Sequence, residues 1–209
     1  MMKLYYFDTL APRKVCAFAR HVGSDVEFVY VDLGRGEHRS EQFLAINPNG
    51  KVPALTDGAQ TLWEADAILC HLSERAASGH WPHDARQIDV IRWFSWNSQH
   101  FLRHGGALFF EHIVKPRFGR GAADPKAVES ALAGFRTCAA VLNAHLKGRE
   151  WLVGDELTVA DFSVAVTLPY AKLAGLPVEE FPEIRRWHDQ LREFPAWREP
   201  FPRAEAEAA

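Results

Sequence analysis

Two patterns of hydrophobic positions divide the chain near residue 77. Before that point, short runs rich in aromatic and β-branched residues, which favour strands, alternate with segments whose apolar residues follow helical spacing. Residues 3–7 and 26–31 are predicted strands, and the segment between them is a predicted helix that ends at Gly23. A strand, a helix and a strand in such close succession indicate a parallel βαβ unit.

The rest of this first region predicts a short helix over residues 41–46, a strand over 51–55, a turn at Asp57-Gly58, a second short strand, and a helix over 65–72. Pro53 lies inside the predicted strand, where it cannot donate a ladder hydrogen bond, so the strand has an exposed edge or an unusual peptide geometry there. With a cis Val52–Pro53 bond, the backbone N–H and C=O of Val52 would point out of the sheet, where an extended peptide-like ligand could pair with them.

After a break in the pattern at residues 78–83, all strong periodicity is helical. One helix is predicted from residue 85 to about 103, with a kink or break at Gly105-Gly106. Another begins at Asp124-Pro125, residues 158–161 form a variant capping box, and a last amphipathic helix over 184–191 ends before Pro195. We therefore expect an α/β domain at 1–77, a linker at 78–83, an all-helical domain at 84–202 and a frayed tail at 203–209.

Composition limits the classes of partner. The chain has 209 residues, of which 47% are hydrophobic and 24% charged, as in an ordinary soluble globular protein. Its net charge of −3 gives no indication of a nucleic-acid partner or of an anionic membrane. Three cysteines without CxxC spacing suggest free thiols in a reducing compartment. With no signal-peptide pattern and no apolar run near the ~18 residues of a membrane span, the sequence predicts a cytoplasmic protein.

The chemistry of the first region is concentrated in one loop and the helix that follows it. Asn47-Pro48-Asn49-Gly50 has the residue types of a tight turn, and Glu64 stands where the 65–72 helix begins. Free backbone N–H groups and the helix dipole make such a helix start a binding site for a carboxylate. The stretch therefore offers a peptide-pairing edge beside an anion site.

Two runs carry a family resemblance: Asn-Pro-Asn-Gly-Lys-Val-Pro-Ala-Leu at residues 47–55 and Leu-Trp-Glu-Ala-Asp-Ala-Ile-Leu at residues 62–69. They resemble the glutathione-binding half of a cytosolic glutathione transferase, and the resemblance extends from about residue 3 to residue 200. It implies a thioredoxin-like N-terminal domain in βαβαββα order, followed by an all-helical C-terminal domain. It also implies a homodimer that takes glutathione as co-substrate and acts in detoxification.

The resemblance assigns contacts to glutathione. In this family the cis-proline loop holds the cysteinyl part, here at Val52 and Pro53, and an acidic–serine pair holds the γ-glutamyl end. Glu64 supplies the acid, but Ala65 stands where serine is usual, so backbone N–H contacts survive while one hydroxyl contact is lost. Three basic residues are candidates for binding the glycine carboxylate: His38, Arg39 and Lys51.

The enzymes of this family use the thiolate of glutathione as a nucleophile, and a hydrogen bond donated to the sulfur favours that charged form. The donor is a tyrosine at the end of the first strand, or a serine or cysteine in the loop after it. Tyr6 lies near the tyrosine position, and Thr9 lies near the serine position by its distance from Lys14. We take Thr9 as the first candidate and Tyr6 as the second; backbone N–H groups or Arg13 are the remaining alternatives.

By the same resemblance, the helix after residue 85 contributes to the dimer interface and to the pocket for the electrophile. Trp96, His100 and His104 are the candidate pocket residues, and an aromatic wall suits an apolar second substrate. His100 and His104 are four residues apart, as zinc ligands on a helix are. Because no third ligand with suitable spacing stands nearby, we expect no metal site.

The sequence thus predicts a glutathione transferase that stabilises the thiolate of glutathione for attack on a small, apolar electrophile. Three alternatives stay open: a glutathione-dependent disulfide-bond reductase, a glutathione-dependent isomerase or dehalogenase, and a non-enzymatic binding protein on the same fold. The retained loop and Glu64 argue against the last of these, because a pure scaffold has no need of a glutathione site. The sequence does not specify the second substrate.

Overall fold

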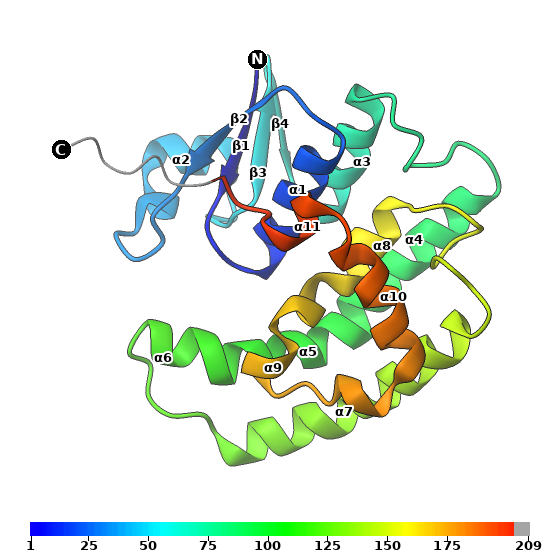
Figure 1. Cartoon of the computed structure of the whole chain (residues 1–209). Coiled ribbons are helices and arrows are strands. Elements are labelled where there is room, and N and C mark those ends of the chain that lie inside the picture. Colours follow the sequence, from blue (N-terminus) through cyan, green and yellow to red (C-terminus); the bar gives the residue numbers. More distant parts are fainter. Residues whose placement is uncertain (203–209) are drawn as a thin grey trace. The chain divides into compact units, whose positions relative to one another are not determined.

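The computed structural model describes residues 1–202 and contains two compact units (Figure 1). The first unit comprises Met1–Ser78 together with the described part of the chain from Glu193 onward, and the second is Gly79–Arg192. The tail predicted at 203–209 lies outside the described residues. The last part of the expected helical domain, from residue 193, is therefore grouped with the first unit.

The first unit is built on a four-stranded sheet in the order β2-β1-β3-β4. Its strands are β1 (Met2–Tyr6), β2 (Val26–Tyr30), β3 (Ala54–Asp57) and β4 (Gln60–Trp63). β1 pairs in parallel with β2 and antiparallel with β3, so that Leu4 lies opposite Phe28 on one side and Leu55 on the other. The parallel βαβ unit and the thioredoxin-like order are confirmed.

Helices cover both faces of this sheet. These helices are α1 (Leu10–His21), α2 (Glu41–Ile46), α3 (Ala65–Arg75) and α11 (Pro195–Arg198), with a 3-10 turn η1 at Glu37–Arg39. Figure 1 shows α1 and α3 on one side of the sheet and α2 on the other. Alternation along β1 is consistent with this arrangement, because the fully buried Leu4 points to the face opposite Tyr5, whose ring packs against Phe43 of α2. The Lys14 ammonium, which is almost completely buried, forms an ion pair with Asp66 and thereby links α1 to α3.

The second unit is helical throughout. Its elements are α4 (Arg86–Trp96), η2 (Asn97–Phe101), α5 (Leu102–Phe109), η3 (Phe110–Val114), α6 (Lys115–Arg117), α7 (Pro125–Leu146), α8 (Val159–Val164), η4 (Ala165–Tyr170), α9 (Ala171–Ala174), η5 (Val178–Glu180) and α10 (Pro182–Arg192). Of these, η2 and η3 are π-helical turns, so the stretch from Arg86 to Arg117 stays helical while its hydrogen-bond pattern changes. The predicted starts at Asp124 and Thr158 are confirmed as helix N-caps.

Of the kink or break predicted at Gly105-Gly106, the break is wrong, because α5 runs through both residues. Gly105 is buried against Thr167 of η4, and a Cβ atom on it would lie 3.1 Å from the Thr167 side chain. This glycine therefore allows two helical segments to approach closely.

The strand predicted over 51–55 also begins too early, since β3 starts at Ala54. Pro53 has no N–H to donate, and the ladder begins directly after it.

The capping box before α8 is confirmed, and its acid is completely buried. Asp161 accepts hydrogen bonds from the Thr158 N–H at 2.9 Å, the Leu152 N–H at 3.0 Å and the Trp187 indole N–H at 2.9 Å. Burial raises the pKa of the Asp161 carboxyl, and these donors act in the opposite direction. Since Leu152 lies in the preceding loop and Trp187 in α10, one carboxyl group connects three segments of the second unit.

Candidate functional site

The loop singled out in the sequence borders a cavity of about 480 Å³ in the first unit. Its wall is formed by the residue before α1, Leu33 and the η1 turn that follow β2, Leu44 of α2, and the loop between α2 and β3. Six of its lining residues are polar or were candidates for the glutathione site: Thr9, His38, Arg39, Asn49, Lys51 and Val52. The fold thus brings together Thr9, both members of the basic pair and the loop, although they are up to 43 residues apart in the sequence (52 − 9).

Asn47 organises this loop from beneath. Its side chain is buried, donates to the Lys51 carbonyl at 2.6 Å and accepts from the Asn49 N–H at 3.0 Å. Gly50 has φ of +59°, and a Cβ there would lie 3.2 Å from the His38 carbonyl oxygen, so a larger residue is disfavoured. These bonds fix the backbone that leads into Val52. The sequence identified Asn47 only as a turn residue and missed that its buried side chain braces the loop at the Lys51 carbonyl.

The structure has a cis Val52–Pro53 peptide bond, as the sequence analysis considered. Val52 stands outside the ladder of β3, which begins at Ala54. Ala54 pairs with Trp63, so the next residue, Glu64, lies beside the loop at the start of α3. Glu64 is exposed, has φ of +70° and serves as the N-cap, and Ala65 is buried behind it. Neither residue is among those that line the cavity itself.

The two candidate thiol donors lie in different surroundings. Thr9 is the N-cap of α1, and it lines the cavity. In the described structure, its side chain makes no capping hydrogen bond. Tyr6 is 8% exposed, and its ring packs against Phe28, Tyr30 and Phe201 at centroid distances of 6.1, 5.7 and 5.8 Å. Burial, followed by the nearby Cys16 and Tyr30, raises the pKa of the Tyr6 hydroxyl. Of the two, only Thr9 is among the residues that line the cavity.

The Arg13 side chain is engaged elsewhere. It is buried, and its guanidinium donates to the Trp197 carbonyl at 2.6 Å and lies 5.5 Å from the centre of the Trp197 ring.

At the cavity, His38 and the exposed Arg39 are neighbours, with 3.4 Å between the Arg39 Nε and the His38 Nε2. The charges of Arg39 and the exposed Lys51 give one side of the cavity a positive character suited to a carboxylate.

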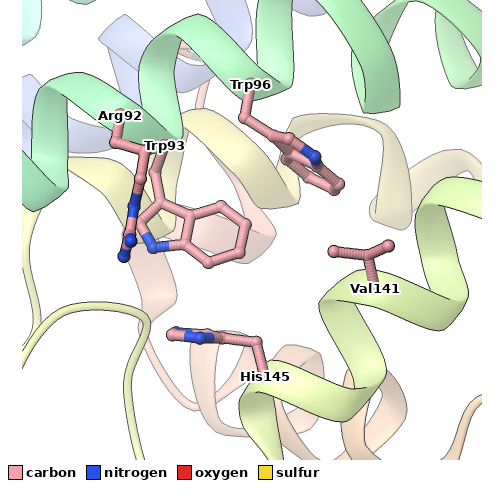
Figure 2. A pocket seen from close by; sticks show the side chains of 5 residues that line it. All are labelled: Arg92, Trp93, Trp96, Val141 and His145. Atoms are coloured by element: carbon pink, nitrogen blue, oxygen red, sulfur yellow. The ribbon is translucent and has the colours of Figure 1, made fainter.

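The second unit has a pocket of its own, with a volume of about 250 Å³. Figure 2 shows Trp93 and Trp96 of α4 facing Val141 and His145 of α7, with Arg92 beside Trp93. His145 donates its Nε2–H to the Leu152 carbonyl at 2.9 Å, and burial lowers its pKa. Its imidazole is therefore neutral at pH 7, and the pocket walls are apolar and aromatic.

The predicted pocket residues separate in the structure. Trp96 lines the pocket, and His100 is exposed with its ring centre 6.3 Å from that of Trp96. His104 instead packs against Gly134 of α7, where a Cβ atom would lie only 2.2 Å from the imidazole. Trp93 was expected on the same helix face as Trp96 but was not among the pocket candidates, and the sequence analysis missed His145. The available signal was the four-residue spacing of Val141 and His145 on the helix opposite the tryptophans.

Within residues 1–202, no group of three or more His, Cys, Asp or Glu side chains is placed to hold a metal ion. In that same part of the chain, none of the helices combines the length and the apolar character required to cross a bilayer.

Comparison with known proteins identifies the family. Residues 2–74 match the model described as "Glutathione S-transferase, N-terminal domain", and residues 125–190 match "Glutathione S-transferase, C-terminal domain". The chain is 34% identical over 205 residues to glutathione S-transferase 3 of Zea mays, covering 94% of this chain and 91% of that protein. These matches place the chain in a class of enzymes that uses glutathione. Its thioredoxin-like unit with a cis-proline loop, followed by a helical unit, agrees with that class.

Solved structures agree. The structure of glutathione S-transferase III in its apo form is 32% identical, covers 95% of this chain and 94% of that one, and has a TM-score of 0.84. That of glutathione S-transferase-I with the ligand lactoylglutathione is 25% identical, covers 95% and 97%, and has a TM-score of 0.86. The chain belongs to the glutathione S-transferase family of enzymes.

Proposed function

We propose that this protein binds glutathione in the cavity of the first unit, stabilises its thiolate through the Thr9 hydroxyl, and transfers the thiolate to a small, apolar electrophile. One observation carries the proposal: Thr9, the basic residues and the cis-proline loop line the same cavity. Its volume of about 480 Å³ is within the usual range of small-molecule sites.

The wall of the cavity suits a tripeptide with a carboxylate at each end. Arg39 and Lys51 offer positive charge to the glycine carboxylate, and His38 lines the cavity beside them. The Val52 backbone, outside the β3 ladder, pairs with the cysteinyl residue as an added strand would. At the other end, the N–H groups at the start of α3 hold the γ-glutamyl carboxylate, and the exposed Glu64 carboxylate attracts its ammonium group.

Thr9 is placed to act on the sulfur. The N-terminal end of α1 carries a partial positive charge, and a hydroxyl that donates to a thiolate lowers the thiol pKa further. The Thr9 side chain makes no capping bond in the described structure and lines the cavity, so its hydroxyl stands where it can donate to a ligand sulfur. Tyr6 packs within an aromatic cluster, which supports a structural role for it.

The pocket of the second unit supports the proposal that the electrophile is apolar. Trp93, Trp96 and the neutral His145 form an apolar aromatic pocket, which favours planar or aromatic molecules over charged ones. We therefore propose an apolar second substrate, for which an aromatic halide is a suitable probe.

The test of glutathione binding is thermal. At ~100 times its dissociation constant, a ligand that binds only the folded state adds ~2.7 kcal/mol to the free energy of unfolding. We expect the melting temperature to rise in millimolar glutathione, and conjugation of an aromatic halide to exceed reduction of a mixed disulfide. An unchanged melting temperature with both reduced and oxidised glutathione would exclude the proposed site. Faster disulfide reduction than conjugation would keep the site and replace the reaction.

We also propose a two-fold dimer that uses α3 and α4, as is typical of the family. The exposed apolar residues of α4, Ile88 at 69% and Ile91 at 45%, support this assignment. Sedimentation at micromolar concentration should give the mass of two chains, whereas a monomer at that concentration would contradict the assignment.

A further inference from the structure

After the second unit, the chain returns to the first and lies along α1. Figure 1 shows the short helix α11 next to α1. Trp197 of α11 is 1% exposed, so it is part of the core of the first unit. At the far end of α1, the ring centre of Phe194 lies 4.8 Å from that of His21, and Arg20 donates to the Phe201 carbonyl at 3.2 Å. Residues 194–201, named here the C-terminal strap, therefore contact α1 at more than one turn.

The strap also holds the backbone on both sides of Thr9. Three residues before it, the Tyr6 ring stacks on Phe201 with a centroid distance of 5.8 Å and an angle of 13° between the rings. Four residues after it, the Arg13 guanidinium donates to the Trp197 carbonyl at 2.6 Å. The Arg13 N–H donates to the Thr9 carbonyl at 3.0 Å, which closes the first turn of α1. Two anchors on one segment thus bracket the residue that bears the thiol-activating hydroxyl.

The position of Thr9 matters because hydrogen bonds weaken steeply with distance and angle. In the described structure, its side chain has no capping bond to fix it, so the place from which its hydroxyl reaches the sulfur is set by the position of the Thr9 backbone. That backbone is held in turn by Tyr6 and Arg13, whose partners are in the strap. The groups expected to bind the rest of glutathione, in the 47–53 loop and at Glu64, have no role in these contacts.

We propose that the C-terminal strap positions Thr9 for thiol activation, with Phe201 and Trp197 as positioning residues. This inference rests on the proposed function of Thr9. The strap residues do not touch the sulfur; they act through Tyr6 and Arg13. Loss of a strap contact should therefore change the pKa of the bound thiol more than it changes the affinity for glutathione.

The test uses Phe201→Ala, which removes the stack on Tyr6 at the edge of the unit. The thiolate absorbance of the enzyme–glutathione complex, followed against pH, should shift by about half to one pH unit to the alkaline side. Accordingly, kcat/KM for conjugation should fall about three- to tenfold below the thiol pKa, while the glutathione Kd changes less than about twofold. Phe201→Tyr, which keeps the ring, should restore the original pKa. Leu173→Ala, at an exposed position in α9, serves as a matched control.

A second readout needs no glutathione. Hydrogen exchange of the Arg13 N–H in the free protein reports the bond to the Thr9 carbonyl, and we expect it to be about tenfold faster in Phe201→Ala. Unchanged exchange at Arg13 together with an unchanged thiol pKa would overturn the inference. A lower melting temperature and weaker glutathione binding without an alkaline shift would make the strap merely structural and also overturn it. If the unsubstituted protein binds no glutathione, the proposed function fails, and the exchange measurement still decides whether the strap holds the Thr9 segment.

Discussion

Replacing Thr9 by valine removes the proposed donor while keeping the shape of the side chain. A hydrogen bond to a charged group contributes ~1.5–3 kcal/mol. Each pKa unit corresponds to ~1.36 kcal/mol of preference for one protonation state, so losing the bond should raise the pKa of the bound thiol by about one to two units. Because the Thr9 side chain makes no capping bond in the described structure, we expect the substitution to leave the stability of α1 nearly unchanged.

The assay is the pH profile of kcat/KM for conjugation of an aromatic halide, which reports the pKa of the thiol. For Thr9→Val the profile should move to higher pH, and the rate below pH 7 should fall ~10-fold or more. Tyr6→Phe is the matched control, since it removes the rival hydroxyl and retains the ring that stacks on Phe201. We expect no alkaline shift for this variant.

Two outcomes would refute this reasoning. If Tyr6→Phe moves the profile and Thr9→Val does not, the donor is Tyr6 and the enzyme is of the tyrosine type. If neither substitution moves it, backbone N–H groups and the dipole of α1 hold the thiolate without a side chain. In that case disulfide reduction becomes the better interpretation of the site.

Three further predictions concern single residues. Asp161→Ala should lower the free energy of unfolding by about 4 kcal/mol in urea titrations, because it leaves several buried donors unpaired; a loss below ~1 kcal/mol would contradict this. Lys115 lowers the pKa of Glu111, so the carboxylate stabilises the fold above its unfolded pKa near ~4.3, and this contribution disappears as pH falls through the folded pKa. Glu111→Gln should therefore be less stable than the unsubstituted protein at pH 7, with the difference closing in acid; an equal difference at both pH values would refute the assignment. Lys51→Met should raise the glutathione Kd about two- to fivefold in calorimetry, with a smaller effect in high salt; an unchanged Kd would remove Lys51 from the site.

Features with a local cause were predictable from the sequence. The strands β1 and β2, the start of α7 at Asp124 and the capping box at Thr158 depend on residue types within a few positions of one another. The cis-proline loop was also readable, because its turn residues and its spacing to Glu64 are compact in sequence.

Features that depend on distant partners were not predictable in this way. Gly105 was read as a break because glycine weakens isolated helices, whereas here it permits close contact with Thr167, 62 residues later (167 − 105). His104 was assigned to the pocket because it was expected to share a helix face with Trp96, but the space beside Gly134 accommodates its ring. The contact between Arg13 and Trp197 joins segments from nearly opposite ends of the described chain. Periodicity shows which face of a helix is apolar, and it does not show which segment covers that face.

The return of the chain to its first unit has a consequence for biosynthesis. Residues 1–78 leave the ribosome first, but Trp197, which completes their core, is made only after the 114 residues of Gly79–Arg192. At ~5–20 residues per second, this is a delay of ~6–23 s. During that interval the face of α1 that will receive Trp197 remains uncovered, and Arg13 lacks its carbonyl acceptor. The first unit, although it is synthesised first, can therefore complete its core only after the whole second unit has been made.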